Sequence, residues 1–177
     1  MNFLKKWINC IVTFVAGVCG LAFAAFSGLV MKAMGTSQSV KAFDIITDAE
    51  AYTESKLLGL ETEFVFVKAA SIAMLVVAII LLVYSVVLLL RNLNVIKSES
   101  KVFDIVNYAL IAVLVVVAIV LFVASIIYAN GYADAFTKMA GIKITGTMGS
   151  YQPLMLAVSL VSAAVTGLFA FLSRKDA

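Results

Sequence analysis

The chain has 177 residues, of which 64% are hydrophobic and 13% charged, and its net charge is +3. Soluble domains carry about 45–50% apolar and about 25% charged residues, so a single water-soluble core could not bury this much apolar surface. The small, dispersed charge gives no indication of nucleic-acid binding. The absence of histidine excludes histidine-ligated metal sites and histidine acid–base catalysis.

Four windows of the sequence contain no charged residue: 7–31, 69–90, 105–128 and 151–173. Each reaches the roughly 20 apolar residues that cross a hydrocarbon core about 30 Å thick. The sequence therefore predicts an all-α integral membrane protein, a single domain over 1–177 that folds as a bundle of four transmembrane helices. Outer loops are expected at about 32–68 and 129–150, and a cytoplasmic loop at about 91–104.

Basic residues near the span ends predict that both termini are cytoplasmic. The short inner segments carry Lys5, Lys6, Arg91, Lys97, Lys101, Arg174 and Lys175, and their net charge is +4. The long outer segments spread six lysines among seven acidic residues, a net charge of −1. Because the outer loops have neither cysteine nor a glycosylation sequon, a bacterial inner membrane is favoured over a eukaryotic cell surface.

Small residues recur every four positions in the first and the last window. The first stripe consists of Ala16, Gly20, Ala24 and Gly28, and the second of Ser159, Ala163 and Gly167. Small side chains let helix backbones approach closely, and helix packing in lipid depends on that approach. We therefore expect the first and fourth spans to meet along these stripes, within one chain or between subunits, although small residues are common in any membrane helix.

The first outer loop contains a predicted helix at 42–60, with a possible capping box at Thr47 and Glu50 and a stop at Gly59. Six acidic residues lie in this region: Asp44, Asp48, Glu50, Glu54, Glu61 and Glu63, which leave 41–63 with a net charge of −4. They form either a solvated helix face or a negatively charged surface that attracts cations or a basic partner. We favour the solvated face, because the spacing of a calcium loop is missing.

The second outer loop is predicted to begin at Asn130-Gly131 and to contain a short strand at 142–145. With the helix of the first loop, this strand would form a small extracytoplasmic cap over the spans. Tyrosines at the outer span ends, Tyr128, Tyr132 and Tyr151, indicate a belt of aromatic side chains at the membrane interface.

The sequence shows no constellation for catalysis. No nucleophile stands beside a base, no acids are paired near a span end, and no metal-ligand spacing is present, so we predict no catalytic, cofactor-binding or metal-binding residue. The spans also lack central charges, which disfavours proton-coupled and voltage-driven transport.

These features favour a non-enzymatic four-span protein that acts through helix packing and outer-loop contacts, as an accessory subunit of a membrane complex or a self-associating scaffold. Its expected partners are the lipid bilayer and other membrane subunits or copies of itself. The alternative is a homo-oligomeric channel or pore, because a wide lumen needs no charge. The four-span layout resembles that of claudin-like and tetraspanin-like proteins, but the loop cysteines and Trp/Cys motifs of those families are absent.

Overall fold

The computed structural model describes residues 2–96 and 101–175 and is mostly helical (79%). Its four long helices are α1 (Asn2–Ala22), α4 (Glu61–Asn92), α5 (Val102–Ala140) and α6 (Tyr151–Lys175). Each of the four is long and apolar enough to cross a membrane. The structure confirms the prediction of a mostly helical, membrane-embedded chain with four candidate spans.

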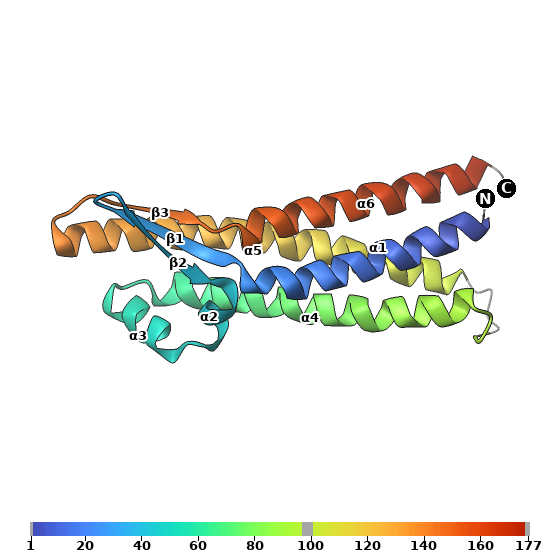
Figure 1. Ribbon diagram of the computed structural model, residues 1–177, viewed down its shortest axis with the longest axis horizontal. Coiled ribbons are helices and arrows are strands. Elements are labelled where there is room, and N and C mark those ends of the chain that lie inside the picture. Colours follow the sequence, from blue (N-terminus) through green and yellow to red (C-terminus); the bar gives the residue numbers. More distant parts are fainter. Residues whose placement is uncertain (1, 97–100, 176–177) are drawn as a thin grey trace.

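The long helices form an antiparallel bundle (Figure 1). α1 packs mainly against α4 and α6, and α5 packs against the same two helices from the other side. Both chain termini lie at one end of the bundle, which we call the terminal end (Figure 1). The segments that join α1 to α4 and α5 to α6 lie at the opposite end, and we call them together the cap.

Two of the helices are much longer than a bilayer requires. α4 has 32 residues and α5 has 39, against 21 in α1 and 25 in α6. At about 1.5 Å per residue, α5 measures about 58 Å, whereas a hydrocarbon core is about 30 Å thick. The excess lies at the cap end (Figure 1). The predicted loop start at Asn130-Gly131 is therefore wrong, because α5 continues to Ala140 and ends at the left-handed Gly141.

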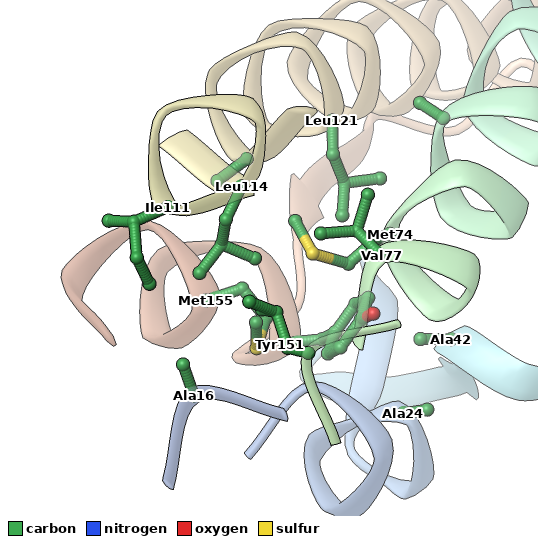
Figure 2. Packing of buried hydrophobic residues seen from close by; sticks show 13 residues of the cluster. Ala16, Ala24, Ala42, Met74, Val77, Ile111, Leu114, Leu121, Tyr151 and Met155 are labelled. Carbon is green, nitrogen blue, oxygen red and sulfur yellow. The ribbon is translucent and has the colours of Figure 1, made fainter. Parts of the chain in front are cut away.

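Apolar side chains from all four long helices fill the middle of the bundle (Figure 2). Met74 on α4, Leu114 and Leu121 on α5 and Met155 on α6 are completely buried. The outward faces of α4 and α5 are aliphatic and exposed, as Val83 and Val116 show. This arrangement suits a bundle whose interior is solid and whose outside faces lipid.

The small-residue stripe of α1 lies close to both α4 and α6 at Gly20, where a Cβ atom would lie 3.6 Å from Cε of Met155 on α6 and closer still to α4. Ala16 is completely buried, and a Cβ atom at Gly20 would lie 2.5 Å from the Cβ of Ala78. The helix ends before the stripe does, because Ala24 lies in a 3-10 turn (Phe23–Ala25) and Gly28 lies in a strand. The predicted first span, 7–31, is therefore too long by the residues from Ser27 onward.

On α6, the members of the second stripe occupy different environments. Ser159 is completely buried, and Ala163 is partly buried against the hydrophobic core. Gly167 is exposed, and a Cβ atom there would meet nothing within 4 Å. The three residues therefore do not form one continuous contact surface in this chain.

A three-stranded antiparallel sheet corrects the prediction that the protein is all-α. Its strands are β1 (Ser27–Ala33), β2 (Thr36–Lys41) and β3 (Ile144–Met148), in the order β2-β1-β3. The apolar run Leu29–Met31 continues the first charge-free window, so hydropathy alone could not distinguish this strand from the end of a span. The predicted strand at 142–145 is present but begins two residues later.

The hairpin between β1 and β2 turns through two residues. Ala33 pairs with Thr36, and the intervening Met34 and Gly35 both have positive φ angles, as a type I′ turn requires. This turn is usually signalled by Asn-Gly or Asp-Gly. Met-Gly carries a weaker signal, so the hairpin was not predicted.

The predicted helix at 42–60 is in fact two helices, α2 (Ala42–Thr47) and α3 (Ala49–Leu57). Asp48 separates them and caps α3, because its carboxylate accepts a hydrogen bond from the N–H of Glu50 at 2.8 Å. The capping residue is thus Asp48 and not Thr47. The predicted stop at Gly59 is confirmed: its φ angle is 73°, and the N–H of Leu60 donates to the carbonyl of Ser55 at 2.8 Å, as in a Schellman motif.

Close backbone contacts attach the cap to the bundle. A Cβ atom at Gly146 of β3 would lie 2.2 Å from the carbonyl oxygen of Ala129 on α5, so only glycine fits there. The buried amide of Gln152 on α6 donates to the Gly28 carbonyl at 2.8 Å and to the Ser125 hydroxyl at 3.1 Å. The first and second connecting segments and two long helices therefore meet at one point.

We predict that Gly20→Leu destabilises the bundle and Gly167→Leu does not. Leucine at position 20 would clash with Ala78, and overpacking of this kind costs typically about 1–3 kcal/mol. Gly167 is surrounded by open space, so the same substitution there should leave the melting temperature in detergent unchanged or slightly raised. Thermal unfolding followed by circular dichroism checks both, and equal melting temperatures would contradict the α1–α4 contact.

Candidate functional site

A cluster of buried and partly buried polar side chains lies at the terminal end of the bundle. We call it the terminal cluster, and it consists of Asn9 and Thr13 on α1, Arg91 on α4, and Asp104 and Asn107 on α5. None of these residues was predicted as a site. Arg91 was assigned to a loop, and Asn9 and Asn107 lie inside charge-free windows. Buried amides within apolar windows are the signal that could have identified them.

An ion pair joins α4 to α5 in this cluster. Arg91 is the penultimate residue of α4, and its Nη1 donates to Oδ1 of Asp104, in the first turn of α5, at 3.2 Å. The arginine side chain is 6% exposed and that of Asp104 24%. The guanidinium carbon also lies 5.1 Å from the ring centroid of Phe103, a cation–π distance. The neighbouring Tyr84 hydroxyl donates to the Phe103 carbonyl at 2.6 Å.

Amide and hydroxyl groups join α1 to α5 across the bundle. The Thr13 hydroxyl oxygen lies 2.7 Å from the backbone carbonyl oxygen of Asn9 and 2.7 Å from Oδ1 of Asn107. Its single proton can be donated to only one of these oxygens at a time. Asn9 and Asn107 are 1% and 0% exposed, and both side-chain atoms of Asn9 and Nδ2 of Asn107 have no hydrogen-bond partner among the described residues. A buried polar atom without a partner costs about 1–3 kcal/mol, so stability alone does not explain these amides.

The terminal cluster therefore connects α1, α4 and α5 by polar contacts at one end. A further bond, from Nδ2 of Asn92 to the carbonyl of Lys6 at 3.0 Å, ties the end of α4 to the start of α1. The cluster offers hydrogen-bond donors, hydrogen-bond acceptors and one ion pair. Such a set can orient helices or bind a small polar group.

The six predicted acidic residues are distributed over α2, α3 and the start of α4, and three of them have local roles. Asp48 caps α3, Glu54 accepts a hydrogen bond from the Tyr132 hydroxyl at 3.3 Å, and Glu61 accepts one from Tyr52. That last bond is the main reason why the pKa of Tyr52 lies above its ordinary value, with smaller contributions from burial and from the charge of Glu61. Over residues 2–96 and 101–175, no three His, Cys, Asp or Glu side chains are placed to hold a metal ion.

A continuous row of aromatic rings fixes the cap to α5. It runs through Tyr52, Phe64, Tyr128, Tyr132 and Phe136, with successive ring centroids 5.7–6.0 Å apart. The Tyr128 hydroxyl also lies 2.9 Å from that of Ser55 on α3. Tyr128 and Tyr151 are buried in the protein, so the predicted interfacial belt is wrong for both.

A groove lined by both apolar and charged residues opens on the cap, between the α3–α4 junction and the protruding part of α5. This cap groove has a volume of about 420 Å³ and is lined by Leu57, Leu58, Leu60, Gly131, Asp134, Ala135, Lys138 and Met139. Leu57 is 79% exposed and Met139 71%. Met139 lies 11 residues, or about 16 Å of helix, beyond Tyr128, where the charge-free window of α5 ends. The groove therefore lies past the apolar part of the helix.

Comparison with protein families, with curated proteins and with solved structures finds no match to this chain. The class that the structure itself defines is a membrane protein with four apolar helices and a mixed α/β cap.

We predict that Arg91→Met lowers the free energy of unfolding by about 1–3 kcal/mol, because it removes a buried charge-assisted hydrogen bond. The double variant with Asp104→Asn should lose less than the sum of the single variants, with a coupling of about 0.5–3 kcal/mol. Reversible unfolding in mixed detergent micelles measures these values. Lys101→Met, which removes an exposed charge at the same end, is the control and should change little. Strict additivity of Arg91→Met and Asp104→Asn would show that the pair has no energetic role.

Proposed function

We propose that this chain is a non-enzymatic, four-span membrane protein whose cap binds another protein, either a subunit of a membrane complex or a second copy of itself. The observation that carries the proposal is the cap groove. It exposes Leu57 and Met139 on the part of the molecule that projects beyond the length needed to cross a bilayer.

Exposed apolar side chains have a different meaning in water and in lipid. On the membrane-facing helices they are solvated by acyl chains, but in water each Å² of apolar surface costs about 25 cal/mol. Contiguous apolar surface with a polar rim is typical of sites where proteins bind one another. Asp134 and Lys138 also line the cap groove and supply charges of both signs that could orient a partner.

The proposed orientation places both termini in the cytoplasm and the cap outside, in the plasma membrane and, by its loop composition, the inner membrane of a bacterium. Arg91 and Lys101 adjoin the connection between α4 and α5, at the same end as Lys6 near the N-terminus, which supports this orientation (Figure 1). Lys97 lies outside the described residues. The six acidic residues of the first connecting segment are at the opposite end.

The alternative, a homo-oligomeric channel or pore, has weaker support. Ala16 is completely buried, and Gly20 lies against Ala78 and Met155 of the same chain, so neither residue is free to line a lumen between subunits. The outward faces that remain are rich in leucine, isoleucine and valine, and such a lining would oppose the passage of ions.

We predict that Leu57→Glu combined with Met139→Glu abolishes association of the protein with its partner. The measurement is native mass spectrometry of the protein purified from its own membranes in mild detergent. The wild-type protein should carry a stoichiometric second subunit, another protein or a second copy, that is lost from the double variant. Met34→Glu is the control, because Met34 is 81% exposed on the cap and does not line the groove. A monomeric wild-type protein without any partner would contradict the proposal.

The orientation predicts which single cysteines are accessible from outside. In a background with Cys10→Ala and Cys19→Ala, a cysteine at Thr145 should react with a membrane-impermeant maleimide on intact cells. A cysteine at Val95 should react only after the cells are opened. Both positions are exposed, so burial does not explain a difference. The opposite labelling pattern would place the cap in the cytoplasm.

A further inference from the structure

A second groove, which is apolar, lies between α1 and α6, among residues of the two charge-free windows that cross the membrane. We call it the membrane groove. It has a volume of about 320 Å³ and is lined by Ile11, Val12, Val15, Ala157, Val158, Val161, Ser162 and Val165. Ser162 is the one hydroxyl-bearing residue in this lining and is 5% exposed, so the accessible walls are aliphatic. Ile11 and Val161 are 56% and 62% exposed, so the groove opens toward the surrounding lipid.

We propose that the membrane groove binds one acyl chain of a phospholipid. An acyl chain gains no hydrophobic free energy when it moves from lipid to protein, so binding has to come from close packing. A groove between two helices offers this packing, because its walls contact the chain from both sides, whereas a convex helix surface contacts it from one.

The size of the groove favours an acyl chain over another helix. On α6 it extends from Ala157 to Val165, about 12 Å of helix. Over that length an α-helix, about 10–12 Å across with its side chains, occupies roughly 900–1,400 Å³, several times the volume of the groove, so only part of its surface could enter. A single hydrocarbon chain is narrow enough to enter.

The charges near the groove place the lipid headgroup at the terminal end. Ile11 is five residues, or about 8 Å, from Lys6 along α1. On α6, Val165 is nine residues, or about 14 Å, from Arg174, which is followed by Lys175. Basic residues at this end of both helices favour an anionic phosphate headgroup. The chain would then run from the terminal end into the groove.

The proposal is tested by photo-crosslinking in vesicles that contain phosphatidylglycerol with a diazirine in the middle of one acyl chain. Peptides that contain residues 11–15 and 157–165 should be crosslinked several-fold more than peptides from the outward faces of α4 and α5. Equal crosslinking of all exposed helix faces would mean that the groove is filled by ordinary bulk lipid, and the proposal would be overturned.

A matched pair of variants makes the test specific. Val161→Phe fills the membrane groove and should reduce crosslinking to α1 and α6 several-fold. Val116→Phe places the same ring on α5 at a residue of similar exposure, 59% against 62%, and should have no effect. Val15→Phe fills the groove from the α1 wall and repeats the test if Val161→Phe does not fold.

The same variants distinguish lipid from protein as the occupant. If Val161→Phe and Val15→Phe leave crosslinking unchanged, no acyl chain occupies the groove. If they convert a dimer into a monomer in native mass spectrometry while the wild-type protein shows no preferred crosslinking, another chain occupies it. Either result would overturn the proposal. The cap variants are not part of this experiment, so its outcome is independent of the proposed protein partner.

Discussion

The mismatch between the length of α5 and the thickness of a bilayer governs the shape of the molecule. About half of the roughly 58 Å of this helix crosses the hydrocarbon core, and the rest has to lie beside something other than lipid. The cap supplies that surface. Strand β3 lies against the α5 backbone at Gly146, and the aromatic row from Tyr52 to Phe136 covers a second face. The cap therefore depends on the protruding helix for its own core.

The sequence predicts the helices that lie in lipid, because their composition alone identifies them. It does not predict features that depend on contact with one particular residue elsewhere in the chain. Long charge-free windows predict helices, because every backbone N–H and C=O group in lipid needs a hydrogen-bond partner and a helix supplies these partners within one segment. The strand at Ser27 escaped prediction because Leu29–Met31 continues the apolar run. The periodicity of Ala16 and Gly20 indicated a close contact but did not identify Ala78 as its partner. Asn9 and Asn107 are not indicated by the charge-free windows, because such windows can contain a buried, uncharged amide.

Polar contacts at the two ends of the bundle complement the apolar packing between them. At the terminal end, Arg91 and Asp104 join α4 to α5, and Thr13 joins α1 to Asn107. At the cap end, Gln152 binds the Gly28 carbonyl. Between these ends the close approach of Gly20 to Ala78 constrains the packing of α1 on α4. The directional bonds at both ends add to this contact in fixing the register of the helices.

The two grooves differ in lining, since Asp134 and Lys138 line the cap groove whereas the membrane groove is almost wholly aliphatic, and they are subject to different forces. The cap groove lies beyond the membrane and is surrounded by water. The exposure of Leu57 and Met139 to water therefore costs free energy, which a protein partner would recover by covering them. Lipid surrounds the membrane groove, so Val161 carries no such penalty, and only packing can retain an occupant there. Affinity at the cap should therefore depend on how much apolar area a partner covers. At the membrane groove, affinity for an acyl chain should depend on how well the chain fits the groove. One phenyl ring added to the groove should therefore be enough to weaken binding.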